Sequence, residues 1–167
     1  MVLGMSLATF TLVHVIISLI AIVAGLIVMF GMLNSNTMPG LTAIFLLFTI
    51  LTSATGFLFP FEHLLPSHMI GILSLVLLAI ACIALYGTKL HGVWRPVYVV
   101  TALASLYFNV FVLIIQSFLK VPALHAIAPG NPPAGAAFAV VQGLVLVFFI
   151  VVIIGSWRRY RPVPSFA

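Results

Sequence analysis

The chain has 167 residues, of which 65% are hydrophobic and only 4% are charged. A soluble domain carries about 25% charged residues, so this composition cannot cover a surface that faces water. It excludes cytosolic enzymes, secreted scaffolds and nucleic-acid-binding proteins, and it predicts a protein that lies in a bilayer. The single cysteine, Cys82, cannot form an intrachain disulfide or a CxxC redox pair.

Five apolar runs are long enough to cross a bilayer, which takes about 20 helical residues. None of them contains Lys, Arg, Asp or Glu. They cover residues 7–32, 41–59, 69–86, 97–118 and 136–157. The connections between them are rich in Pro, Gly and Asn, which interrupt helices. The sequence therefore predicts an all-α fold, an integral membrane bundle of five transmembrane helices, with residues 1–167 forming a single transmembrane domain.

The positive charges predict how the bundle is oriented, because cytoplasmic loops are enriched in Lys and Arg. Five of the six cations fall on the side of the C-terminus: Lys89, Arg95, Arg158, Arg159 and Arg161. Lys120 and the only acidic residue, Glu62, fall on the other side. We therefore expect the N-terminus outside and the C-terminus in the cytoplasm, in a multi-pass protein of a bacterial inner membrane.

Polar and small residues on each span share one helical face, which predicts the side that points into the bundle. In the first span this face includes His14, in the fourth Asn109, and in the fifth Gln142. For the third span the predicted face consists of His68, Ala79, Cys82 and Tyr86. Helix packing explains most Ser, Thr, Ala and Gly positions, whereas buried Asn and Gln are costlier and are candidates for lining a site.

Counting 1.5 Å per residue from the outer edge places His14 and Gln142 about 9 to 11 Å deep, with Asn109 a little deeper. The loops above them contain most of the other ionisable residues: Glu62, His63, His68 and His125. The single acid and four of the five histidines therefore collect in the outer half of the bundle. We expect a ligand site there, since an ionisable residue inside a membrane is a functional candidate.

Haem b is one candidate ligand for this site. His14 and His68 are placed to act as axial ligands, and Gly56 and Gly71 leave room for a porphyrin. In three short patches of the first half, namely His14, the Thr55-Gly56 pair, and His68 followed by Gly71, the chain resembles small bacterial b-type cytochrome subunits. This resemblance implies a bound haem, although such subunits have more histidines within their spans than the one found here.

Two other ligands are candidates for the same half of the bundle. A transition-metal ion such as Zn, Fe or Cu(II) would be held by a mixed set of ligands: Glu62, His63, His68 and His125. A quinone-like or lipid-like molecule would instead accept hydrogen bonds on its carbonyl groups from His14, Asn109 or Gln142. No spacing among these residues is diagnostic of one of the three ligands.

The leading functional hypothesis is a small redox or ligand-binding membrane protein whose site centres on His14. The alternative is an accessory subunit of a larger membrane complex, since residues 144–154 are apolar on every face. A third hypothesis is a small transporter that acts as a homo-oligomer. The expected partners are the lipid bilayer and either further copies or a larger complex, with no nucleic acid, and the residues do not distinguish an enzyme from a binding protein.

Overall fold

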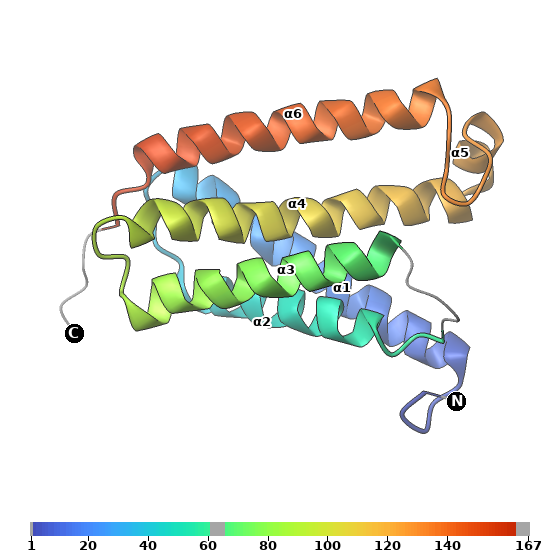
Figure 1. The fold of residues 1–167 in the computed structure, drawn as a ribbon, viewed down its shortest axis with the longest axis horizontal. Helices are drawn as coiled ribbons and strands as arrows, with labels where there is room; N and C mark the ends of the chain where they lie inside the picture. The colour runs from blue at the N-terminus through green and yellow to red at the C-terminus, as the bar shows by residue number, and fades with distance from the viewer. Residues whose placement is uncertain (1, 61–65, 163–167) are drawn as a thin grey trace.

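The computed structural model describes residues 2–60 and 66–162, and within these ranges the chain folds into helices joined by loops (Figure 1). The long helices are α1 (Leu7–Leu33), α2 (Pro39–Gly56), α3 (Pro66–Cys82), α4 (Trp94–Lys120) and α6 (Ala136–Arg159). The π-helical turn η1 (Ile83–Gly87) continues α3, and the short α5 (Pro122–Ile127) follows α4. Among the described residues, five segments are long and apolar enough to cross a membrane. The prediction of an all-α, multi-pass membrane bundle is confirmed.

Local sequence signals explain where several helices begin. The Ser6 hydroxyl caps α1 and accepts a hydrogen bond from the Thr9 backbone N–H at 3.1 Å. Pro39 and Pro122 open α2 and α5, a position where the missing N–H of proline costs nothing. Helix α2 ends at Gly56, three residues earlier than predicted, and α5 was not predicted at all. If α3 and η1 are counted as one span, the other bounds differ from the predicted ones by three residues or fewer.

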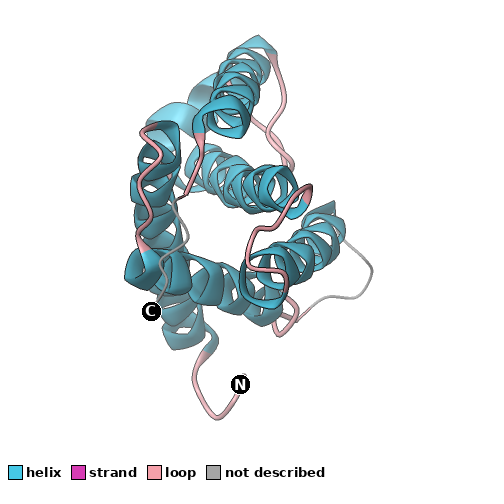
Figure 2. Cartoon of the chain, turned by 90° about the vertical axis from the view of Figure 1, so that its left-hand side faces the viewer, coloured by secondary structure: helices cyan, strands magenta, loops and turns pink. Residues whose placement is uncertain are grey.

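Helices α1 to α4 form a ring in which each packs against the next and α4 returns to α1 (Figure 2). Helix α6 lies outside this ring against α4 and α1. Consecutive long helices run in opposite directions (Figure 1). We call the end that holds the start of α1, the end of α4 and α5 the N-terminal end, and the opposite one the C-terminal end.

The hydrophobic core occupies the half of the bundle next to the C-terminal end. Its largest fully buried side chains include Met29, Met32, Phe45, Leu78, Tyr98 and Leu103. Side chains of α2 and α4 pack against α1 at Gly25, where an added Cβ would lie 2.6 Å from Leu106 Cδ1 and 2.8 Å from Phe45 Cδ2. Only glycine fits at this crossing without moving its neighbours.

The predicted inward face of the third span is wrong for two of its four residues. Ala79 and Tyr86 are exposed, whereas Ser74, Leu78 and Ala81 are buried. In a membrane helix both large and small apolar side chains can face lipid or protein. Small size alone therefore does not identify the buried face. The π-helical turn that contains Tyr86 also rotates the last residues away from ordinary helical spacing.

The C-terminal end is closed by the segment that follows α6. The Arg95 guanidinium donates hydrogen bonds to the backbone carbonyls of Trp157, at 3.4 Å, and Tyr160. The Tyr160 side chain is buried. The backbone N–H of Arg161 donates to the Ser35 hydroxyl at 2.7 Å, which ties the segment to the loop between α1 and α2.

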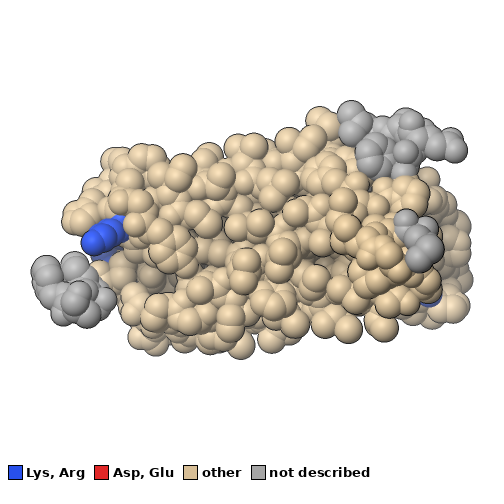
Figure 3. All heavy atoms as spheres, turned by 90° about the horizontal axis from the view of Figure 1, so that it is seen from below, with Lys and Arg blue, Asp and Glu red and all other residues tan. Residues whose placement is uncertain are grey.

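Charge is sorted between the two ends of the bundle. Five cations lie at the C-terminal end: Lys89, Arg95, Arg158, Arg159 and Arg161. Lys120, the last residue of α4, lies at the opposite end. The face drawn in Figure 3 shows blue atoms only near its two ends, with an uncharged surface between them. This pattern suits a helix bundle surrounded by lipid, and the direction in which it crosses the membrane stays a prediction.

Candidate ligand-binding site

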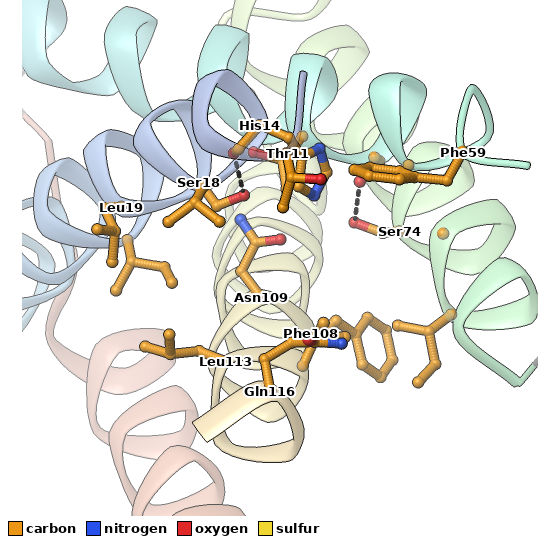
Figure 4. A pocket seen from close by; sticks show the side chains of 18 of the residues that line it. Thr11, His14, Ser18, Leu19, Phe59, Ser74, Phe108, Asn109, Leu113 and Gln116 are labelled. Carbon is orange, nitrogen blue, oxygen red and sulfur yellow. Dashed lines mark hydrogen bonds between the residues drawn. The ribbon is translucent and has the colours of Figure 1, made fainter. Parts of the chain in front are cut away.

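A cavity of about 600 Å³ lies in the half of the bundle next to the N-terminal end, between α1, α2, α3 and α4 (Figure 4). Its polar lining residues are Thr11, His14, Ser18, Thr52, Ser53, His68, Ser74, Asn109, Gln116, Ser117 and Lys120. The rest of the lining is aliphatic, aromatic, Gly or Pro. Both its size and this mixture of a mainly apolar wall with a few polar groups are typical of small-molecule sites.

Most hydroxyl groups of the cavity wall are already used by their own helices. Ser18 donates to the carbonyl of His14, Thr11 to Leu7 and Thr52 to Phe48, each at 2.8 Å. Between α2 and α3, the Ser53 hydroxyl donates to that of Ser74 at 3.2 Å (Figure 4). These bonds satisfy the donors locally, so the hydroxyls contribute a packed wall more than free binding groups.

His14 is held in one tautomer by its neighbour on α2. Its Nδ1 lies 2.8 Å from Thr55 Oγ1, and the same Oγ1 lies 2.6 Å from the Leu51 carbonyl oxygen. A hydroxyl has one proton, and two oxygens this close require that proton between them, so Thr55 donates to Leu51. Thr55 must then accept from Nδ1–H of His14, which leaves a lone pair on Nε2. That Nε2 makes no hydrogen bond with any described residue.

Aromatic rings in the segment that follows α2 pack against His14 and His68. The Phe59 ring meets the His14 ring edge to face, with centroids 5.2 Å apart. The Phe57 ring lies 5.6 Å from that of His68, a buried residue in the first turn of α3. Beside His14 the wall is open, because a Cβ at Gly56 would still be 4.0 Å from His14 Cε1.

Asn109 of α4 supplies the second free polar group. Its side chain is 9% exposed and lines the cavity. The side-chain amide makes no hydrogen bond within the described ranges, and its Nδ2 is fully buried. In Figure 4 this amide points toward the part of α1 that carries Ser18, one turn from His14. A buried polar group without a partner is rare and calls for an explanation.

The cavity opens sideways between α1 and α4. Lining residues on these two helices are also exposed at the surface, with exposed fractions of 40% for Val15, 44% for Leu19 and 37% for Leu113. On the opposite wall, Ser53 and Ser74 are buried. Between Leu19 and Leu113 the exposed lining is aliphatic, as expected where a bundle faces hydrocarbon, whereas Gln116 and Lys120, nearer the end of α4, are exposed and polar.

The structure brings three of the four predicted ligand-binding residues to one cavity, namely His14, His68 and Asn109. Gln142 does not line it. Its Nε2 donates to the Phe111 carbonyl at 3.1 Å, so this side chain links α6 to α4.

The predicted metal ligands do not form a cluster in the part of the chain that is described. Glu62 and His63 lie outside the described residues. His125 is exposed on α5, which packs mainly against α4, while His68 is buried at the start of α3. No three His, Cys, Asp or Glu side chains within residues 2–60 and 66–162 come together. A metal site at these four residues stays a prediction.

Several lining residues were missed at the level of sequence. Ser74 was detectable, because it is an isolated polar residue in an apolar span. Phe57, Phe59 and Phe108 were not, since nothing in an apolar run distinguishes an aromatic ring that faces a cavity from one that faces lipid.

Comparisons with known protein families, with curated proteins and with solved structures give no match to this chain. The site is therefore interpreted from its own chemistry. It offers two imidazoles, the buried amide of Asn109, the exposed Gln116 and Lys120 near one end, and a mainly apolar wall. These groups can bind and orient a small molecule that has an apolar body and a few hydrogen-bonding atoms.

Proposed function

We propose that this chain is a small polytopic protein of a bacterial inner membrane that binds a mainly apolar small molecule in the cavity between α1 and α4. The observation that carries the proposal is that two polar groups on the wall of a cavity of about 600 Å³, His14 Nε2 and the Asn109 amide, have no hydrogen-bond partner among the described residues. His14 would be the buried polar contact of the ligand, with His68 further along the same wall.

The size of the cavity argues that something occupies it in the membrane. Its opening between α1 and α4 lets molecules of the bilayer enter, so a cavity of about 600 Å³ is filled rather than empty, and its polar groups decide between the occupants. A lipid acyl chain could fill the apolar part through the side opening. It would leave His14 and Asn109 unpaired, at about 1–3 kcal/mol for each buried group. A ligand with polar atoms avoids this cost.

A test of this proposal compares two leucine substitutions that differ only in where they lie. Gly56→Leu extends into the cavity beside His14, whereas Gly143→Leu lies on the exposed surface of α6, where a Cβ meets nothing within 4 Å. The purified proteins are extracted with solvent and the small molecules are identified by mass spectrometry. We expect one oxygen-containing apolar molecule in near-stoichiometric amount with the wild type and Gly143→Leu, and its loss with Gly56→Leu. Identical extracts from all three proteins would refute the proposal.

Haem b is a second candidate occupant. An imidazole that donates Nδ1–H and keeps Nε2 free is arranged as metal-bound histidines usually are, and His68 lines the same cavity. Protein purified after expression with added haem should then show a Soret band that shifts on reduction. A spectrum without such a band removes haem.

An accessory subunit, or a homo-oligomer that acts as a transporter, is the alternative to any ligand. It is supported by α6, whose side chains Leu144, Val147 and Val151 are exposed and which packs mainly against α4 and α1. In that case Gly143→Leu, rather than Gly56→Leu, would weaken assembly with the partner chains, as measured by native mass spectrometry.

A further inference from the structure

The hydrogen-bonding state of His14 restricts which ligands the cavity can take, and this inference rests on the proposed function. Thr55 uses its only proton on the Leu51 carbonyl and therefore accepts from Nδ1–H of His14. A neutral imidazole has one N–H, so its Nε2 can only accept. The neutral form is the one that the apolar interior of a membrane favours, because a charged side chain is costly there.

An acceptor on the cavity wall requires a donor on the ligand. A ligand whose polar atoms are all carbonyl or ether oxygens would place lone pairs against the Nε2 lone pair and leave it unpaired. A ligand hydroxyl instead donates to Nε2. Asn109 fits the same ligand, since the Oδ1 of its amide has no partner among the described residues and can accept from a second hydroxyl. This reverses the direction expected from the sequence, in which His14 donates to a carbonyl.

The remaining wall indicates the shape and the source of the ligand. Three phenylalanine rings, those of Phe57, Phe59 and Phe108, line the cavity, and aromatic rings pack well against a planar ligand. The side opening at Leu19 and Leu113 is aliphatic and faces hydrocarbon. A ligand that enters there is dissolved in the membrane rather than in water.

We propose that the cavity binds a membrane-dissolved phenol of the hydroquinone class, with a ring hydroxyl that donates to His14 Nε2 and an oxygen paired with the Asn109 amide. The oxidised quinone, which has carbonyls only, binds more weakly because it has no proton to give to His14. The proposal concerns binding and selection between these two forms, and it includes no electron transfer by the protein.

The test uses the full chain in phosphatidylcholine nanodiscs under anaerobic conditions. Binding of a decyl-substituted hydroquinone, of its quinone and of its dimethyl ether is measured by titration calorimetry, with empty nanodiscs as the reference for partitioning. The wild type is expected to bind the hydroquinone about tenfold or more tightly than the dimethyl ether, which leaves Nε2 unpaired. His14→Phe keeps an aromatic ring without the acceptor, and is expected to bind all three compounds with similar affinity.

The outcomes separate this inference from the proposed function. Equal affinity for the hydroquinone and its dimethyl ether, with both lost in Gly56→Leu, overturns the hydroxyl requirement but supports a ligand in the cavity. Binding that Gly56→Leu does not change also overturns the inference, because the compounds then bind elsewhere. Retention of the hydroquinone preference in His14→Phe overturns the role of His14. Circular dichroism spectra and elution volumes like those of the wild type show that each variant is folded.

Discussion

The hydrogen bond between His14 and Thr55 can be measured directly as a coupling energy between α1 and α2. Thr55→Val removes the hydroxyl at nearly constant shape, and His14→Phe removes the donor at nearly constant shape. The bond is 2.8 Å long and joins residues 41 positions apart, so only the folded bundle can form it. Measured hydrogen bonds between membrane helices contribute about 0.6 kcal/mol on average and up to about 1.7 kcal/mol. We expect the double-mutant cycle to give a coupling within this range.

The control is Thr49→Val on the same helix. The Thr49 side chain is fully buried, and its hydroxyl donates to the Phe45 carbonyl of its own helix at 2.7 Å. Such bonds back to the helix contribute little or slightly weaken it. We therefore expect Thr49→Val to change the unfolding free energy by less than about 0.5 kcal/mol and to show no coupling with His14→Phe.

The assay is reversible unfolding in mixed detergent micelles, followed by far-ultraviolet circular dichroism. A coupling below about 0.3 kcal/mol between Thr55→Val and His14→Phe would refute the reasoning, because distant independent sites add to within that error. Hydroquinone binding provides a second measurement. Without Thr55 to fix Nδ1–H, His14 can also place its proton on Nε2, where it can donate to an ether oxygen, so Thr55→Val should narrow the preference for the hydroquinone over its dimethyl ether.

Three further substitutions test other parts of the structure. Gly25→Ala should lower the Tm, because overpacking at this helix crossing costs about 1–3 kcal/mol against a gain of about 1 kcal/mol in helix propensity, whereas Gly40→Ala, with nothing within 4 Å, should keep or raise it. Arg95→Leu should destabilise the protein by about 1 kcal/mol through loss of its bonds to the end of α6, and the exposed Lys89→Leu serves as its control; equal Tm values for these two would contradict that role. Leu19→Trp narrows the side opening and should slow hydroquinone association in stopped-flow measurements, and an unchanged rate would argue for another entry.

The number and placement of the spanning helices were predictable because hydrocarbon imposes a simple requirement on sequence. A helix needs about 20 apolar residues to cross it, and runs without charge satisfy this only five times in the chain. The ends were less predictable. Helix α2 begins at Pro39, two residues before the predicted start, and its last residue is Gly56, three residues before the predicted end.

The site was only partly predictable, and Gln142 shows why. Its helical face and its depth matched those of His14 and Asn109, yet its partner is a backbone carbonyl of α4, that of Phe111. Every residue has such a carbonyl, so sequence cannot indicate which one a buried amide reaches. His14 and Asn109 were identifiable as costly polar residues. The direction of hydrogen bonding at His14 was not, because it depends on the 2.6 Å contact between Thr55 and Leu51.

One half of the bundle is closely packed and the other half contains the cavity, and α1 contributes to both. Ala21, Ala24 and Gly25 are buried, and Gly25 lies against both α2 and α4, so these helices pack closely from there to the C-terminal end. Toward the N-terminal end the same face of α1 presents Ser18 and His14 to the cavity instead. Because the close-packed half holds the helices together, the other half can keep an unpaired acceptor and a cavity without loss of the fold. We therefore expect substitutions near Gly25 to change Tm first, and those near His14 to change ligand binding first.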